Sequence, residues 1–286
     1  MGSQIESLVK MVKEREGKGS VKAKVLSFVS GKGGVGKTGI TTSLAYILAN
    51  HFKKRVLLLD CDIGLGNVHL LLGLSPEKSL KSVLQGAPIE GVIQRAFNYD
   101  VVLGFSGLEA LEELEALEAA NLVMQIERVM SSYDYVILDN GAGINRYTVG
   151  FSRAAATTYV VTTPEPTALT DAYAFIKSLF KLYGYSSFKV VVNMVKDREE
   201  GFRTFERLKA STVKFLGVEP KLAGTVPYSE RFKEALKRRK PLCALYPNEP
   251  YCVEIKRIAQ LETGELLPED GGGFVKRLLK FLFQGD

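Results

Sequence analysis

The sequence is poor in the residues that build metal clusters and disulfide frameworks. Its 286 residues include three cysteines and two histidines. Cys61, Cys243 and Cys252 show no CxxC spacing, and only His51 and His69 are present to accompany them. An odd number of cysteines without paired spacing argues against a disulfide framework and against a zinc site. It also argues against an iron–sulfur carrier, which holds its cluster with cysteine thiolates.

Long hydrophobic runs are also missing. No stretch approaches the roughly 20 apolar residues that a transmembrane helix needs. The first residues, with Glu6, Glu14 and Glu16 among their lysines, contain no apolar segment of the kind found in a signal peptide. These absences predict a protein of the reducing cytoplasm. The 46% hydrophobic content excludes a globally disordered chain, and the net charge of +6 is compatible with an anionic partner.

Short β-forming runs alternate with helical patterns along the chain. The pattern at residues 38–51 predicts an amphipathic helix with Ile40, Leu44, Ile47 and Leu48 on one face, and leucines recur at helical spacing in the glutamate-rich residues 108–130. The alternation predicts a doubly wound α/β fold, in which helices cover both faces of a mostly parallel sheet. The expected strands are residues 25–29, 55–59, 101–103, 135–138, 158–162, 189–193 and 222–226.

Residues 31–38 match the phosphate-binding motif GxxxxGK[ST]. They follow the first expected strand and precede the first expected helix, which is the context that the motif requires. Backbone N–H groups of such a loop surround the phosphates, and the helix N-terminus adds positive potential. Lys37 is expected to meet the β- and γ-phosphate oxygens, and Thr38 to ligate Mg²⁺. The nucleotide-binding residues predicted by the motif are Gly31, Lys32, Gly33, Gly34, Val35, Gly36, Lys37 and Thr38.

Carboxylates end two of the later strands. Asp60 and Asp62 follow three leucines, and Asp139 follows the apolar residues 135–138. The carboxyl ends of the strands in an open α/β sheet form the edge at which ligands bind, so these acids are expected near the phosphates. The strand that ends at Asp139 resembles a Walker B strand, whose aspartate holds Mg²⁺ through a water molecule.

Together these motifs resemble the MinD/ParA family of ATPases. A second lysine in the phosphate loop, here Lys32, marks the deviant Walker A class within that family. The resemblance covers nearly the whole chain and extends to the flagellar-number regulators called FlhG, FleN or YlxH. It rests on residues 30–42, 58–73 and 139–144, and above all on the string VTTPEPTALTDAY at residues 161–173.

The resemblance implies an ATPase that uses ATP and Mg²⁺. Asp62 would position the attacking water, and Lys37 and Lys32 would neutralise charge on the γ-phosphate. In proteins of this class the lysine that corresponds to Lys32 reaches the nucleotide of the partner, so the resemblance implies an ATP-dependent homodimer. The alternative is that Lys32 contacts only the phosphates of its own subunit. The implied metal site is formed by Thr38, Asp60 and Asp139.

The resemblance also implies where the base and one protein partner bind. Asn193, Pro227 and Tyr228 would hold adenine; an amide suits an adenine edge, although an ordinary strand-end cap is the alternative for Asn193. Relatives begin with a short DQAxxLR motif that stimulates the GTPase FlhF. Only Gln4 and Leu8 correspond to it in this sequence, so Gln4 is the expected partner-activating residue.

Two ends lie outside the α/β pattern. Residues 1–22 form an arm, residues 23–268 the expected ATPase domain, and residues 269–286 a tail that begins beside three consecutive glycines. On a helical wheel the tail separates an apolar arc from its basic residues, which predicts a reversible anchor on anionic lipid. The alternative is a C-terminal helix packed on the core. The expected membrane-contacting residues are Phe274, Val275, Lys276, Arg277, Leu278, Leu279, Lys280, Phe281 and Leu282.

The expected function is an ATPase switch that regulates the number or placement of flagella. It would attach to the inner face of the cell membrane as a dimer, with FlhF and flagellar C-ring proteins as partners. Two alternatives stay open: a MinD-type division-site ATPase, and a ParA-like DNA-partitioning ATPase that binds DNA through basic residues 233–240. For the basic residues, a solvated helix C-terminus is the preferred interpretation.

Overall fold

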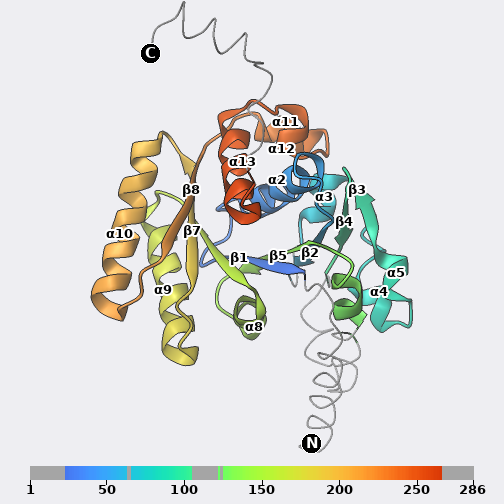
Figure 1. Cartoon of the computed structure of the whole chain (residues 1–286), viewed down its shortest axis with the longest axis horizontal. Helices are drawn as coiled ribbons and strands as arrows, with labels where there is room; N and C mark the ends of the chain where they lie inside the picture. Colours follow the sequence, from blue (N-terminus) through green and yellow to red (C-terminus); the bar gives the residue numbers. More distant parts are fainter. Residues whose placement is uncertain (1–22, 63–65, 105–121, 123–124, 266–286) are drawn as a thin grey trace, which may run out of the picture.

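Eight strands form one sheet through the middle of the structure (Figure 1). The computed structural model describes residues 23–62, 66–104, 122 and 125–265. The strand order is β3-β4-β2-β5-β1-β6-β7-β8, and every pairing is parallel except that of β3 with β4. The strands are β1 (Lys24–Ser30), β2 (Val56–Cys61), β3 (Gln94–Ala96), β4 (Tyr99–Val102), β5 (Tyr135–Ala142), β6 (Thr157–Thr162), β7 (Phe188–Val195) and β8 (Lys221–Pro227).

Helices cover both faces of the sheet. In Figure 1, α2 and α13 lie above the sheet, whereas α8 and α9 lie below it. The helices are α2 (Lys37–Asn50), α3 (Val68–Leu72), α4 (Leu80–Leu84), α5 (Ile89–Val92), α8 (Arg146–Ala154), α9 (Pro166–Tyr183), α10 (Arg198–Leu216), α11 (Phe232–Lys237), α12 (Leu242–Leu245) and α13 (Pro250–Thr263). Among the described residues, no helix combines the length and apolar character needed to cross a bilayer.

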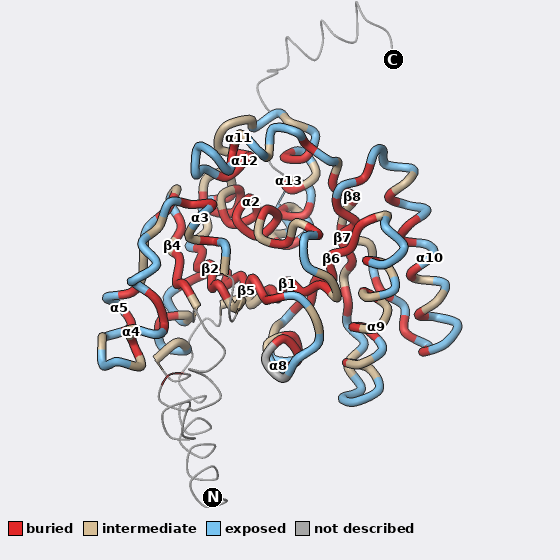
Figure 2. Tube along the Cα trace, turned by 180° about the vertical axis from the view of Figure 1, so that it is seen from behind, coloured by how far each residue is buried: buried red, intermediate tan, exposed pale blue. Residues whose placement is uncertain are grey.

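Side chains that point to opposite faces of the strands divide the core into separate layers. In β2, Leu58 packs in the cluster on the α2 side, whereas Leu57 and Leu59 pack in a cluster with α4 and α5. Successive side chains of a strand point to opposite faces, so a strand that is apolar throughout requires cover on both sides. Figure 2 shows buried residues following the central strands and α2. The predicted doubly wound fold and its seven strands are confirmed.

The sequence pattern missed β3. This strand is only three residues long and lies at the edge of the sheet, where it pairs antiparallel with β4. Phe97 and Asn98 join the two strands, and both adopt positive φ angles of 47° and 68°. Positive φ at both loop residues is the pattern of a type I′ hairpin turn, but the sequence lacks the Asn-Gly pair that usually marks it.

The expectation of an amphipathic first helix is wrong. In α2, 11 of the 14 residues are buried, including polar Thr41, Thr42 and Ser43. The reason is that α2 lies against the sheet on one side and contacts α12 and α13 on another. A helix enclosed in this way is buried nearly all round, and the threonines satisfy their hydroxyls within it: Thr42 Oγ1 donates to the carbonyl of Thr38 at 2.6 Å.

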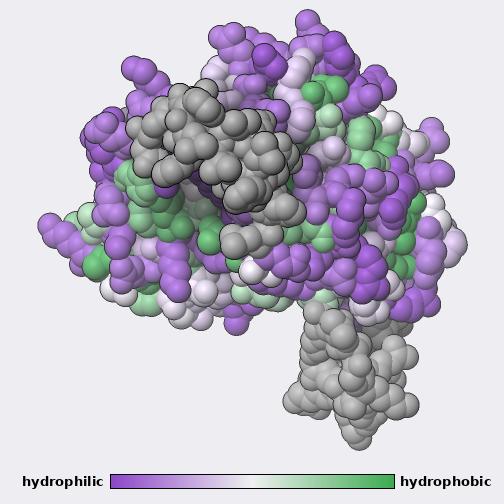
Figure 3. All heavy atoms as spheres, turned by 45° about the horizontal axis from the view of Figure 1, so that its top comes forward, coloured by the Kyte–Doolittle hydropathy of each residue, from purple (hydrophilic) through white to green (hydrophobic). Residues whose placement is uncertain are grey.

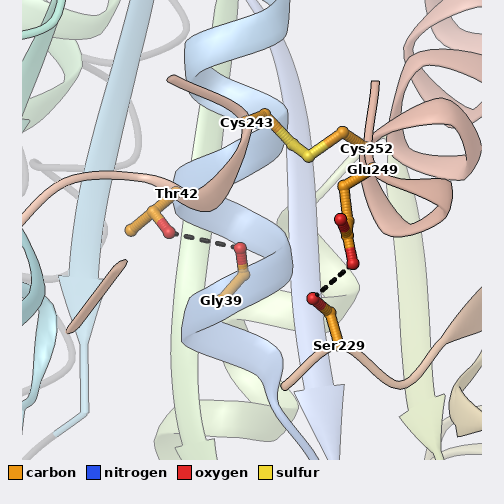
Figure 4. Close-up of a disulfide and its surroundings, with 6 residues drawn as sticks. All are labelled: Gly39, Thr42, Ser229, Cys243, Glu249 and Cys252. Atoms are coloured by element: carbon orange, nitrogen blue, oxygen red, sulfur yellow. Dashed lines mark hydrogen bonds between the residues drawn. A yellow bond between two sulfur atoms is a disulfide. The ribbon is translucent and has the colours of Figure 1, made fainter. Parts of the chain in front are cut away.

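The cysteine spacing argued against a disulfide framework, but the structure contains one disulfide. Cys243 in α12 and Cys252 in α13 form a disulfide, with their Cα atoms 5.4 Å apart (Figure 4). Both residues are buried, whereas Cys61 is a free thiol. The cysteine spacing did not indicate the pair because α12 and α13 bring the two residues together only when both helices pack on α2.

Opening this disulfide is expected to lower the free energy of unfolding by about 2 kcal/mol, because a cross-link restricts the unfolded chain. The comparison is urea unfolding of oxidised protein and of protein kept in a thiol reductant. Cys61→Ser serves as the control and should keep the difference between the two conditions. Cys252→Ser should remove it. A wild-type midpoint that does not move on reduction would contradict the prediction.

Candidate nucleotide-binding site

The phosphate loop joins β1 to α2 at the centre of the sheet. Gly36 precedes the helix with a φ of 86°, and a Cβ at this position would lie 2.4 Å from Asn193 Nδ2, so both the backbone angle and the available space require glycine. Lys37 is buried, and its Nζ donates to Ser30 Oγ at 2.8 Å. Ser30 Oγ in turn donates to the carbonyl of Lys32 at 2.7 Å. These contacts hold the loop around the head of Lys37.

Asp60 and Asp139 are register partners on neighbouring strands, Asp60 near the carboxyl end of β2 and Asp139 in the second half of β5. Both are buried. Burial, with the negative charge of Asp139, raises the pKa of Asp60 to about 8. Burial also raises the pKa of Asp139, to about 6, although Lys37 and Thr38 oppose the shift. Two adjacent buried carboxylates disfavour their own ionisation in the absence of a cation.

The carboxylates fit a small hard cation. Asp139 Oδ1 is buried and, among the described residues, has no hydrogen-bond partner. This oxygen is a buried acceptor without a donor among those residues, and Asp139 lies beside Asp60 and near the hydroxyl of Thr38. Such a site suits Mg²⁺, which is typically held by one or two carboxylates together with phosphate oxygens. Within the described part of the chain, no group of three or more His, Cys, Asp or Glu side chains could hold a metal by itself. Such a site would therefore require the phosphates.

Asp62 lies at the edge of the same cluster. It is half-buried, and its backbone N–H donates to Asp60 Oδ1 at 3.1 Å. Its carboxylate lies close to the end of β5, because a Cβ on Gly141 would come within 2.8 Å of Asp62 Oδ1. The negative charges of Asp139 and Asp62 both act on Lys37 and oppose the effect of burial, which lowers the pKa of that lysine. The structure thus brings together five of the predicted site residues, namely Lys37, Thr38, Asp60, Asp62 and Asp139.

Lys32 has its partners in its own chain. Its Nζ lies 2.9 Å from Glu165 Oε2 and donates to Thr167 Oγ1 at 3.1 Å, where α9 begins. The side chains of Lys32 and Glu165 are 42% and 66% exposed, so this ion pair contributes little stability and is easily exchanged. The cross-dimer role of Lys32 and the same-subunit alternative both stay predictions.

A cavity of about 130 Å³ adjoins the phosphate loop at Gly36. The three residues expected to hold adenine all line it, namely Asn193, Pro227 and Tyr228. Asn193 Nδ2 donates to the carbonyl of Val35 at 2.8 Å, which links β7 to the loop. Asn193 Oδ1 is buried without a partner among the described residues and remains available as an acceptor. This bond is not an ordinary strand-end cap, because it crosses to the phosphate loop.

A local irregularity in β7 shapes this cavity. Met194 has a φ of 57°, and the pairing of β7 with β8 shifts register between Asn193 and Val195. Adjacent residues of a regular strand point to opposite faces, but here Asn193 and Met194 both line the cavity. Positive φ in a non-glycine residue is a strained conformation that is frequent at functional sites. The sequence contains no signal for it.

Further lining residues come from α11, α13 and the segment before α11. They are Ser229, Phe232, Lys233 and Tyr251, none of which the motifs indicated. Ser229 Oγ donates to Glu249 Oε1 at 2.8 Å, close to the disulfide (Figure 4). A larger cavity of about 730 Å³ opens between α10, β8 and α13 and contains none of the predicted site residues. The smaller cavity is therefore the one that belongs to the site.

The basic residues considered for DNA contact end α11 in the way expected of a solvated helix C-terminus. Residues 237–240 are exposed, and Arg238 pairs with Glu234 one turn earlier. In the view that brings this side of the molecule forward, hydrophilic side chains occupy most of the coloured surface (Figure 3). Gln4 and residues 274–282, to which roles were assigned from the sequence, lie outside the described residues, as do most of the glutamate-rich residues 108–130.

Known proteins share both the sequence and the fold. Residues 26–242 match the model of the CobQ/CobB/MinD/ParA nucleotide binding domain. The antiactivator FleN of Pseudomonas aeruginosa is 34% identical over 90% of this chain and 93% of its own. The flagellum site-determining protein YlxH of Helicobacter pylori is 36% identical over 91% of this chain and 90% of its own.

Among solved structures, the MinC:MinD cell division protein complex of Aquifex aeolicus contains a chain with a TM-score of 0.67 and 26% identity. The match covers 88% of this chain and 100% of that one. The match shows that the chain shares the fold of a protein in that complex. The chain belongs to the CobQ/CobB/MinD/ParA family of nucleotide-binding proteins.

Proposed function

We propose that the chain is an ATP-hydrolysing switch of the MinD type. The observation that carries the proposal is the buried group of Lys37, Asp60 and Asp139 at the end of the phosphate loop, in which one oxygen of Asp139 has no hydrogen-bond partner within the described part of the chain. Thr38, Asp60 and Asp139 would hold Mg²⁺, which supplies positive charge to the phosphates when bound. Residues 31–38 would hold the phosphates, and Asn193, Pro227 and Tyr228 the adenine.

The catalytic work assigned to this chain is positioning and electrostatic stabilisation. Lys37 presents its ammonium group from the start of α2, where the helix N-terminus adds positive potential. Asp62 is only half-buried, so its carboxylate is accessible to a water molecule that it can orient. Groups held in place before the reaction lower the barrier without reorganising during it.

The hydrolysis assay uses two variants of the site and one control. We expect Mg²⁺-dependent release of phosphate from ATP, and a loss of at least about 100-fold in Lys37→Gln and in Asp62→Ala. Asp62→Ala should still bind ATP, because Asp62 orients water and does not hold phosphate. Lys177→Gln removes an exposed lysine of α9 and should leave the rate unchanged. A normal rate in Asp62→Ala would show that another group orients the water.

We extend the proposal to dimerisation and membrane attachment. The exposed pair of Lys32 with Glu165 leaves Lys32 free to move to the nucleotide of a second subunit at little cost. Each tail alone would bind lipid weakly, because only one short helix buries its apolar arc. A dimer presents two tails, and the second binds at high effective concentration. ATP would in this way control membrane attachment.

Sedimentation with anionic vesicles tests this link. Wild-type protein with Mg-ATP should pellet with the vesicles, whereas a truncation ending at Pro268 should stay in the supernatant. Lys32→Ala should pellet weakly, to the same extent with and without ATP, because it keeps the tail but not the dimer. Equal sedimentation of wild type and truncation would eliminate the anchor.

The relatives indicate the cellular role that we propose. Because YlxH is named a flagellum site-determining protein and resembles this chain over most of its length, we propose that the chain regulates flagellum number or placement, with FlhF and C-ring proteins as partners. Co-purification from the native cell tests the role. Recovery of division proteins in place of flagellar components would support a division-site role, and recovery of chromosomal DNA would support a DNA-partitioning role.

A further inference from the structure

Phe232 occupies the space that a side chain at position 39 would need. Gly39 follows Thr38 in the first turn of α2 and is buried. A Cβ built on it would lie 2.6 Å from Cζ and 2.7 Å from Cε2 of Phe232, and 3.5 Å from Tyr251 Oη. Carbon atoms pack favourably at about 3.5 to 4.0 Å, so alanine at this position would collide with the ring. Glycine weakens a helix interior, and here its benefit is the close approach of Phe232.

Phe232 links the phosphate loop to the base cavity. It is the first residue of α11, it is partly buried, and it packs against the same core cluster as α2. Its ring lies 6.4 Å from that of Tyr251, at an interplanar angle of 54°. Phe232 and Tyr251 both line the cavity of Gly36 and Asn193. The ring therefore touches the helix that follows the phosphate loop and also forms part of the cavity wall.

We propose that Phe232 is a positioning residue for the base of the bound nucleotide, and that the absence of a side chain at Gly39 determines the position of the Phe232 ring. The inference rests on the proposed nucleotide site and adds a residue to it. A flat apolar ring in a cavity wall suits contact with a heterocyclic base, while the free Asn193 Oδ1 provides a polar contact at the base edge. A Cβ on residue 39 pushes the ring away from α2 by roughly 1 Å, into the volume that the base needs.

Calorimetric binding of two ligands separates the base from the phosphates. Mg-ATP carries both, whereas Mg-tripolyphosphate carries only the phosphate chain. We expect Gly39→Ala to weaken ATP binding about tenfold and to leave tripolyphosphate binding within about twofold of wild type. Leu236→Ala, on the exposed side of α11, is the matched control and should bind both ligands normally.

A double-mutant cycle tests whether the effect passes through the ring. In a Phe232→Leu background, where the shorter side chain leaves room, Gly39→Ala should cost less than about twofold in ATP affinity. An equal loss in both backgrounds would overturn the proposal, and so would equal weakening of ATP and tripolyphosphate.

The single variant Phe232→Leu keeps the test decisive if Gly39→Ala does not fold. It should weaken ATP and not tripolyphosphate; no change in ATP affinity would overturn the inference. A wild-type protein that binds neither ligand would instead refute the proposed function.

Discussion

Replacing Asp60 by asparagine is expected to stabilise the nucleotide-free protein at pH 8 by about 3 kcal/mol. The pKa of Asp60 is raised to about 8 by burial and by Asp139, so the folded protein holds this proton more tightly than the unfolded chain. The free energy of unfolding of the wild type therefore falls as pH rises from about 4 to about 8. The full shift corresponds to roughly 6 kcal/mol. The expected gain is smaller because Asp60 and Asp139 titrate as a coupled pair, and removing the charge of Asp60 also changes the ionisation of Asp139.

Urea unfolding at pH 5 and at pH 8, without nucleotide, measures the effect. The gain of Asp60→Asn should be large at pH 8 and small at pH 5, because pH 5 lies only about one unit above the ordinary pKa of an unfolded aspartate, so ionisation of the unfolded chain favours unfolding only slightly there. Glu230→Gln, an exposed carboxylate, is the control and should not alter the pH profile. A gain of the same size at both pH values would assign the effect to packing. Mg-ATP should reverse the order of stability, because the amide is a poorer ligand for the cation.

Removing the buried carboxylate Glu262 is expected to destabilise the protein by about 3 kcal/mol. Glu262 lies near the end of α13, beside the amino ends of the strands, whereas the phosphate loop follows the carboxyl end of β1. Its Oε2 lies 2.7 Å from Lys24 Nζ, and its Oε1 pairs with Lys189 and accepts from the Tyr159 hydroxyl. It thereby joins α13 to the first residues of β1, β6 and β7. Without the carboxylate, two partly buried lysines and a buried tyrosine lose their partner.

The pH dependence of this contribution has the opposite sign. Burial opposes ionisation of Glu262, but hydrogen bonds from Lys189, Lys24 and Tyr159 together hold its pKa below the usual value. Its stabilisation is therefore present above about pH 4.5 and is lost as pH falls through the lowered pKa. Glu265→Ala removes the neighbouring exposed pair with Lys54 and should cost less than about 0.5 kcal/mol. Similar effects of Glu262→Ala and Glu265→Ala at pH 7 would contradict the prediction.

The motifs of the site could be predicted because they are local in sequence. The phosphate loop is one continuous segment between a strand and a helix, so its contacts depend on neighbouring residues. Asp60 and Asp139 could be paired in advance because both end apolar strands, and parallel strands in one sheet align their carboxyl ends. Their register as partners and their raised pKa values agree with that expectation.

Local sequence decided which segments become strands and helices, where the phosphate loop lies, and which carboxylates face it, because each of these depends on periodicity or on adjacent residues. Only the tertiary structure decided the rest. The contact of Phe232 with Gly39 and the shared lining of Met194 and Tyr251 join elements distant in the chain, and the Cys243–Cys252 disulfide joins two consecutive helices whose relative placement the sequence does not give. Such contacts arise when α11, α12 and α13 pack over α2, and no spacing in the sequence encodes that packing.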